Sequence, residues 1–270
     1  MDLGLKGRTC VVTGASSGIG RETGRLLCAE GANVLLVGRN EERLVEAQRE
    51  AAAAGGAAGG EAQRVTLDVT DANAGVRMLE AATEYFGALD VLINNAGAAQ
   101  WRHLDDVPDE DWYAQYELNV MAPLRAMRAA APAMAERGWG RIVNVCSTAG
   151  KRPSAAMPEY SVAKAAELSL SRLFADHYAK QGVLVNAICP GPVKSELWMD
   201  SGGLLDQSHE MSGAGSREEA LAEAGTKRPI GRLAEVGEIA AAIVFLCSER
   251  ASYVAGAAWS VDGGTVQVII

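Results

Sequence analysis

The chain has 270 residues, 49% of them hydrophobic, and a formal net charge of −9. This length allows one sizeable core in one or two domains, and the acidic balance without a basic run argues against nucleic acid or an anionic membrane as partner. The sequence has no apolar run of 18 residues and no charged leader before an apolar stretch, so we expect a cytoplasmic protein without a membrane span.

Short apolar runs alternate with helical patterns along the whole chain. We predict strands at residues 9–14, 33–38, 62–69, 89–97, 140–147, 183–191 and 257–264. We predict helices at residues 18–30, 40–54, 71–86, 109–137, 158–181 and 235–248. Several strands are apolar almost throughout, which is typical of parallel strands covered on both faces. The alternation predicts a single α/β domain over 1–270, a doubly wound, seven-stranded parallel sheet with helices on both faces.

The segment TGASSGIG (13–20) joins the first predicted strand to the first helix. Its glycines permit a tight turn and close backbone approach, and the following helix N-terminus offers free N–H groups to a pyrophosphate. A glycine turn needed only for packing is the alternative. The candidate cofactor-binding residues here are Gly14, Ser16, Ser17, Gly18, Ile19 and Gly20.

The end of the second strand indicates which dinucleotide binds. NAD sites usually carry a carboxylate there for the ribose 2′-hydroxyl. Here the strand runs into Gly38, Arg39 and Asn40, so the acid is absent and a guanidinium is available for a 2′-phosphate. We therefore predict NADP(H) over NAD(H). The alternative is that Arg39 only faces solvent at a helix start.

Two further strands end at the same predicted edge. Asp68 and Val69 end the third strand and are expected to frame the adenine, while Thr70 or Asp71 is expected to cap the next helix. The fourth strand ends in NNAG (94–97), where Asn95, Ala96 and Gly97 are expected to let the cofactor approach closely. For Asn94, locking neighbouring strands together is the alternative role.

Tyr160 and Lys164 lie four residues apart in a predicted helix, so their side chains share one face. A fixed ammonium nearby favours the phenolate, and at about 5 Å it would lower the tyrosine pKa by roughly two units. The pair is a plausible acid–base device for a hydroxyl or carbonyl group. Taken alone, the two residues fit a solvated helix face better than an acid–base site.

Residues 193–231 form a long insertion that we interpret as a lid, because ligands bind at the carboxyl edge of such sheets. An ordinary surface excursion is the alternative. The insertion contains SREEALAEAG, a predicted short helix with Ser216 as its cap. Large side chains expected near the pocket suggest a hydrophobic or aromatic ketone or alcohol, although they equally fit packing. These are Gln100, Trp101, His103, Trp198 and Met199.

Taken together, TGASSGIG, LDVTD, NNAG, LNV, NVCS, YSVAK, PGPV and VDGG occur in the order of the short-chain dehydrogenase/reductase family, which the chain resembles over essentially its whole length. Ser147 precedes Tyr160 by 13 positions, which is the family spacing. The resemblance extends to 3-oxoacyl-thioester reductases, although the whole family shares it. It implies a Rossmann fold and a catalytic tetrad of Asn119, Ser147, Tyr160 and Lys164.

The resemblance also implies a role for each residue. Ser147 is expected to bond the substrate oxygen, Tyr160 to protonate it, and Lys164 to lower the tyrosine pKa and hold the nicotinamide ribose. Asn119 is expected to anchor a water that relays protons to Lys164. The segment that wraps the nicotinamide carboxamide is matched by Pro190, Gly191, Val193 and Ser195, with Ser195 in place of the more usual threonine.

The expected activity is reduction of a ketone, or oxidation of its secondary alcohol, with NADP(H) as cofactor and a small molecule as partner. The alternatives are an oxidative dehydrogenase of a sugar or polyketide-like alcohol and a catalytically idle dinucleotide-binding regulator. The five cysteines lack CxxC spacing and the three histidines are scattered, so we expect reduced buried thiols and no metal site. We expect a homodimer or homotetramer built on helices 109–137 and 158–181, with the tail VQVII (266–270) packing on a neighbour or on the chain's own core.

Overall fold

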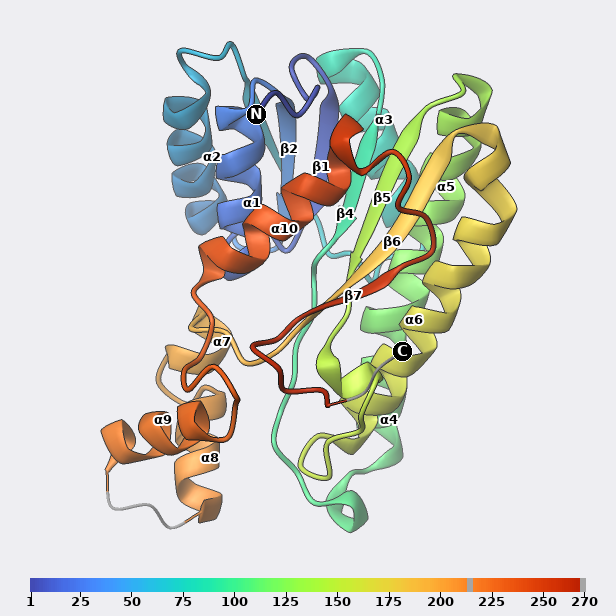
Figure 1. The fold of residues 1–270 in the computed structure, drawn as a ribbon. Helices are drawn as coiled ribbons and strands as arrows, with labels where there is room; N and C mark the ends of the chain where they lie inside the picture. The colour runs from blue at the N-terminus through green and yellow to red at the C-terminus, as the bar shows by residue number, and fades with distance from the viewer. Residues whose placement is uncertain (213–215, 268–270) are drawn as a thin grey trace.

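The structure is a computed structural model that describes residues 1–212 and 216–267 (Figure 1). Within these residues, seven parallel strands form one sheet in the order β3-β2-β1-β4-β5-β6-β7. The strands are β1 (Thr9–Thr13), β2 (Asn33–Gly38), β3 (Ala62–Thr66), β4 (Val91–Asn94), β5 (Gly140–Val145), β6 (Val183–Pro190) and β7 (Ala258–Val261). The predicted doubly wound α/β fold is confirmed.

Helices cover both faces of the sheet because the strands bury side chains on both (Figure 1). In β1, Cys10 and Val12 join the core under one layer, and Val11 joins the core under the other. The first layer holds α1 (Gly18–Ala29), α2 (Glu41–Gly55) and α10 (Val236–Cys247). The second holds α3 (Ala74–Phe86), α5 (Ala122–Glu136) and α6 (Pro158–Tyr178).

The strand order reverses between β1 and β4, because β1 leads outward to β2 whereas β4 leads the other way to β5. The loops that follow these two strands therefore separate at the carboxyl edge of the sheet and leave a crevice between them. TGASSGIG begins at the end of β1 and NNAG begins at the end of β4, so both segments lie at this switch point.

Two predicted boundaries are wrong near β3. The strand ends at Thr66 rather than at residue 69, because the chain turns at Asp68, whose Oδ1 accepts bonds from the Thr70 N–H (3.0 Å) and hydroxyl (2.8 Å). Helix α3 starts at Ala74 with Asn73 at its N-cap. The predicted cap at Thr70 or Asp71 is therefore wrong, since Thr70 is engaged with Asp68 instead.

The helix predicted at 109–137 is not one regular helix. It consists of α4 (Asp109–Tyr116), a π-helical turn (Glu117–Met121) and α5. Such wide turns are often found at functional sites. This one holds Asn119, whose side chain is fully buried.

The insertion follows β6, and its described residues form the short helices α7 (Glu196–Met199), α8 (Leu204–Ser212) and α9 (Arg217–Thr226). They lie beside the carboxyl edge of the sheet in Figure 1. Backbone bonds tie the two ends of the insertion together, from Lys194 N to Ala234 O (2.8 Å) and from Ala234 N to Pro192 O (3.0 Å). The predicted cap is confirmed, because Ser216 Oγ accepts a bond from Glu219 N at 3.1 Å.

Some predictions concern residues that the structure does not describe, namely 213–215 of the insertion and 268–270 of the apolar tail. Across the described ranges, no helix is long and apolar enough to cross a membrane. Across the same ranges, no cluster of three potential metal ligands occurs. All five cysteines are buried and free, and burial raises the pKa of each thiol.

Candidate active site

A cavity of about 1150 Å³ opens at the switch point. It is lined by every predicted cofactor-binding and catalytic residue except Gly20 and Asn119. Gly20 lies behind the loop, where an added Cβ would collide with the Asn95 side chain, and Asn119 lies behind Gly97. The predicted site residues therefore meet at one cavity, and the two exceptions support it from behind.

The glycine loop has the shape that a phosphate cradle requires. Gly14 (φ +64°) and Gly18 (φ +51°) adopt left-handed conformations that other residues rarely adopt. Ser17 caps α1 without a side-chain bond, so the first N–H groups of the helix stay available at its positive dipole end. The loop fits a pyrophosphate on these grounds.

Asn95 joins the two sides of the crevice. Its Nδ2 donates to Thr13 O at 2.9 Å, and its backbone N–H donates to Thr13 Oγ1 at 2.9 Å. Asn94, by contrast, points into the sheet and donates to Asn144 Oδ1 on β5 at 2.8 Å. The structural role considered for Asn94 is thus confirmed, and Asn95 holds the end of β4 against the glycine loop.

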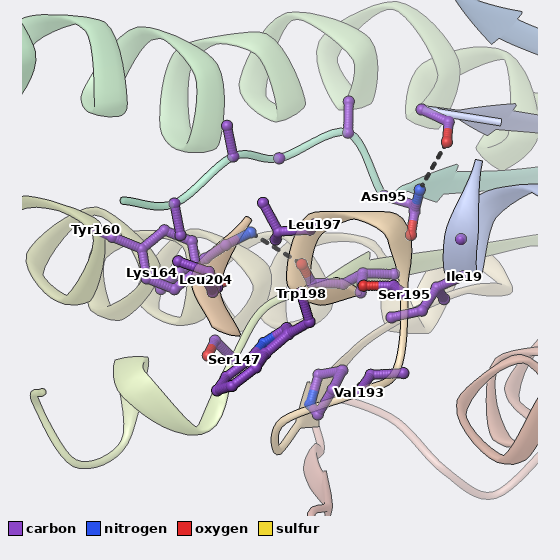
Figure 2. Close-up of a pocket in the computed structure, with 18 of the residues that line it drawn as sticks. Ile19, Asn95, Ser147, Tyr160, Lys164, Val193, Ser195, Leu197, Trp198 and Leu204 are labelled. Carbon is purple, nitrogen blue, oxygen red and sulfur yellow. Dashed lines mark hydrogen bonds between the residues drawn. The ribbon is translucent and has the colours of Figure 1, made fainter. Parts of the chain in front are cut away.

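Ser147, Tyr160 and Lys164 lie together at the other end of the cavity (Figure 2). Ser147 lies two residues beyond β5, and its Oγ accepts a bond from Ala149 N at 3.1 Å. The Ser147 side chain also acts to lower the pKa of the partly buried Tyr160. Lys164 Nζ lies 5.7 Å from the centre of the Tyr160 ring. The predicted grouping of these three side chains is present.

Asn119 completes the group from the π-helical turn. Its Nδ2 donates to Gln115 O (3.0 Å) and Oε1 (2.7 Å), which fixes the orientation of the amide. Its buried Oδ1 has no hydrogen-bond partner and lies on the side of Gly97, where the Lys164 ammonium also lies. A buried unsatisfied acceptor invites an additional donor, and a water or a ribose hydroxyl fits that need.

The predicted lowering of the tyrosine pKa is wrong for this structure. Burial raises the pKa of Tyr160 above its usual value, and the opposing effects of Lys164 and Ser147 do not reverse the shift. Burial lowers the pKa of Lys164, yet the combined effect of Glu167, Tyr160 and Cys146, with Glu167 the largest of the three, raises the net pKa. The sequence analysis missed Glu167, although it follows Lys164 by three positions on the same helix.

The opposite end of the cavity contains two arginines. Arg39 is 79% exposed, and its Nη1 lies 3.7 Å from Asp68 Oδ2. Arg43, which the sequence analysis did not select, lines the same wall from the first turn of α2. A Cβ at Gly38 would lie 3.4 Å from Ser16 Oγ, so a hydroxyl and two guanidinium groups surround the end of β2.

The segment after β6 packs against the glycine loop. Gly191 lies so close to β7 that an added Cβ would be 3.0 Å from Asp262 O. Ser195 is the N-cap residue of α7. A Cβ added at Gly18 would lie 3.3 Å from the Cβ of Ser195. Figure 2 shows Val193 and Ser195 at the end of the cavity near Ile19, with Trp198 between them and Ser147.

The insertion forms an apolar cluster with the catalytic end of the cavity. Trp198 and Leu204 are buried there, and Trp101, Met157 and Tyr160 pack against the cluster. Trp101 N also donates to Gln207 Oε1 on α8 at 2.8 Å. The insertion therefore packs beside Tyr160.

Comparison with known proteins gives consistent matches. The profile of the family described as short chain dehydrogenase matches residues 8–203. D-beta-hydroxybutyrate dehydrogenase of Cupriavidus necator is 35% identical over 264 residues, which cover 97% of this chain and 99% of that protein. Galactitol 2-dehydrogenase (L-tagatose-forming) of Cereibacter sphaeroides is 37% identical over 266 residues, covering 96% and 95%. The crystal structure of L-sorbose reductase from Gluconobacter frateurii, complexed with NADPH and L-sorbose, has a TM-score of 0.91 and 34% identity, and the match covers 100% of both chains.

Proposed function

The chain belongs to the short chain dehydrogenase family, and from that membership we propose that it interconverts a ketone and its secondary alcohol with NADP(H), using Tyr160 as proton donor and acceptor. The observation that carries the proposal is the single cavity in which Ser147, Tyr160 and Lys164 lie at one end and the glycine loop at the other. One extended dinucleotide spans these two ends in a Rossmann fold.

The protein's own residues bind and orient the reactants. The nicotinamide, when bound, supplies or accepts the hydride, which no side chain here provides. The N–H groups at the start of α1 would hold the pyrophosphate, and the Lys164 ammonium, which lies near Gly97, would hold a ribose hydroxyl. Holding both reactants in one geometry removes much of the entropic barrier.

Proton transfer involves the substrate oxygen. The Ser147 hydroxyl bonds this oxygen and fixes it beside Tyr160. In reduction, the O–H bond of Tyr160 breaks and its proton moves to the oxygen while the carbonyl carbon receives the hydride. In oxidation, the phenolate takes the proton back. A raised pKa for Tyr160 keeps the phenol protonated near neutral pH, which suits the reductive direction.

Preference for NADP(H) is part of the proposal. Arg39, Arg43 and Ser16 surround the end of β2, where Gly38 stands in place of a carboxylate. Guanidinium groups bind phosphate oxygens in a bidentate manner, and a carboxylate at this position would repel a 2′-phosphate. The NADPH bound by L-sorbose reductase supports the same assignment.

For the substrate, we propose a small ketone or alcohol with an apolar side. Trp101, Met157, Trp198 and Leu204 form the wall beside Tyr160. A sugar alcohol or ketose is the second candidate, because similar proteins are named for galactitol and L-sorbose. The test is NADPH consumption with a panel of aryl ketones, 3-oxo esters and ketoses. Steady turnover of any member supports the activity, and no turnover of any of them, with NADPH bound, contradicts it.

We further propose a cytoplasmic homo-oligomer whose contacts use α4 and α6. These helices pack against each other and present large apolar side chains to the outside, and a patch of exposed apolar side chains is typical of protein–protein contacts. The exposed residues are Tyr113, Tyr116, Val162 and Leu173. Light scattering tests the oligomer, and a mass of one chain would contradict it.

A further inference from the structure

Glu167 is a buried carboxylate to which the proposed mechanism assigns no role. Its Oε2 accepts a bond from Lys164 Nζ at 2.7 Å, and the two side chains are only 1% and 3% exposed. A buried charge is costly unless it is paired, so this carboxylate and this ammonium need each other. The pair connects Glu167 directly to the proposed acid–base group.

The bonds of Lys164 fix where its ammonium lies. An ammonium has three N–H donors. One points to Val145 O at 2.9 Å, and a second points to Glu167. The third remains for the cavity side, where a Cβ added at Gly97 would lie 3.8 Å from Nζ. Glu167 thus engages one N–H of the Lys164 ammonium. Without this bond the ammonium would be free to shift away from Val145 O.

The pair also changes the field at Tyr160. The ammonium lies 5.7 Å from the phenol ring but 2.7 Å from the carboxylate, so Glu167 compensates much of its charge. The other titratable groups that face the pair are Cys146, after β5, and Cys189, on β6, while Lys151 and Asp262 act more distantly on Cys189. Burial keeps both thiols neutral, which leaves Glu167 as the compensating charge.

We propose that Glu167 is a positioning residue for the reaction: it holds the Lys164 ammonium against Val145 O and, by compensating its charge, keeps Tyr160 a proton donor. This inference rests on the proposed function. It predicts that carbonyl reduction, which needs the protonated phenol, persists into alkaline pH. It also predicts that alcohol oxidation, which needs the phenolate, requires a higher pH than it would if Glu167 did not compensate the charge of Lys164.

The direct test measures the phenol without cofactor or turnover. Protein labelled with ¹³Cζ-tyrosine is titrated by NMR, and Tyr160→Phe assigns the signal. We expect Glu167→Gln to lower the apparent pKa of Tyr160 by about one to two units, because a buried negative charge near the phenol is removed. Glu167→Asp, which keeps the charge, should stay close to the wild type. An unchanged titration in Glu167→Gln would overturn the proposal.

A matched control is available on α9. Glu223 pairs with Lys227 at the same 2.7 Å, but both side chains are largely exposed. Glu223→Gln therefore removes the same charge and should leave the Tyr160 titration unchanged. Should Glu167→Gln fail to fold, the wild-type titration alone decides, since an apparent Tyr160 pKa below about 8, two units under the ordinary value, contradicts charge compensation.

Activity profiles separate this inference from the proposed function. In Glu167→Gln the alkaline fall of ketone reduction and the rise of alcohol oxidation should both move to lower pH by the shift seen in the titration. Turnover that is lost in Tyr160→Phe but has the same profile in Glu167→Gln and wild type would refute only the role of Glu167. Full turnover in Tyr160→Phe would refute the proposed function. The NMR titration of Tyr160 would then still test whether Glu167 compensates the charge of Lys164.

Discussion

Lys164 Nζ donates to the backbone carbonyl oxygen of Val145 at 2.9 Å, which ties α6 to the last residue of β5. Since Ser147 follows β5 by two residues and Tyr160 lies one turn before Lys164, this bond sets the spacing of the proposed catalytic group. The same ammonium holds Glu167, so the site and the local stability depend on one buried cation.

Removing that cation should destabilise the protein in a pH-dependent way. Lys164→Met leaves Glu167 buried and unpaired, and we expect the free energy of unfolding to fall by about 3–5 kcal/mol at neutral pH. Burial raises the pKa of Glu167 above its unfolded value, so the variant keeps its stability at low pH and loses it as pH rises through that pKa. Urea unfolding at several pH values measures this.

The double variant Lys164→Met/Glu167→Leu is the control for that prediction. It removes both charges, so it should recover most of the lost stability and lose the pH dependence. A single variant as stable as the wild type at neutral pH would show that the ion pair does not stabilise Glu167.

Gly20 should not tolerate a side chain. A Cβ there would meet Asn95 Nδ2 and would lie 2.5 Å from Gly14 O, so Gly20→Ala must displace the glycine loop or the end of β4. We expect a loss of about 1–3 kcal/mol in the free energy of unfolding and weaker NADPH binding. Thermal unfolding and fluorescence titration measure the two effects.

Gly56→Ala serves as the comparison, because Gly56 is exposed, has helical angles (φ −45°, ψ −53°) and an added Cβ would meet only Ala53 O at 3.6 Å. It should be neutral or stabilising by less than about 1 kcal/mol. Equal losses in the two variants would argue against a special constraint at Gly20.

Cofactor choice should depend on the end of β2. The variant Gly38→Asp/Arg39→Ile introduces a carboxylate and removes a guanidinium. We expect kcat/KM for NADPH to fall about 10- to 100-fold, because charge-assisted bonds to the 2′-phosphate are lost. The value for NADH should rise. A Cβ at position 38 has room, since its nearest contact is at 3.4 Å.

Steady-state kinetics with both cofactors measures this change. The single variant Arg43→Ala should have a smaller effect, lowering kcat/KM for NADPH and leaving that for NADH unchanged. A wild type that prefers NADH would overturn the assignment before any variant is made.

The sequence predicted the fold because apolar strands and helical patterns alternate along most of the chain, and each strand of the sheet was anticipated. Part of the cavity wall was predicted too, since Gly14, Asn95 and Ser147 all follow strands that end at one edge. Boundaries failed where side chains competed with regular structure, as Thr70 does by bonding Asp68. The π-helical turn at Asn119 was missed because neither spacing nor composition marks it.

The electrostatics of the site could not be predicted from the pair Tyr160 and Lys164 alone. Charge compensation depends on how deeply α6 is buried against β5 and β6, which determines whether Glu167 faces solvent or the ammonium. The position of Glu167 three residues after Lys164 was visible in the sequence, but its burial was not. Tertiary packing therefore reversed the predicted direction of the tyrosine pKa shift.

Tyr160→Phe tests the central claim most directly, because it removes only the hydroxyl that is proposed to donate the proton. The measurement is kcat for ketone reduction by NADPH, together with the Kd for NADPH, in wild type and variant. We predict a fall in kcat of about 10²- to 10⁴-fold with the Kd changed by less than about threefold. A variant that keeps wild-type kcat would contradict the account.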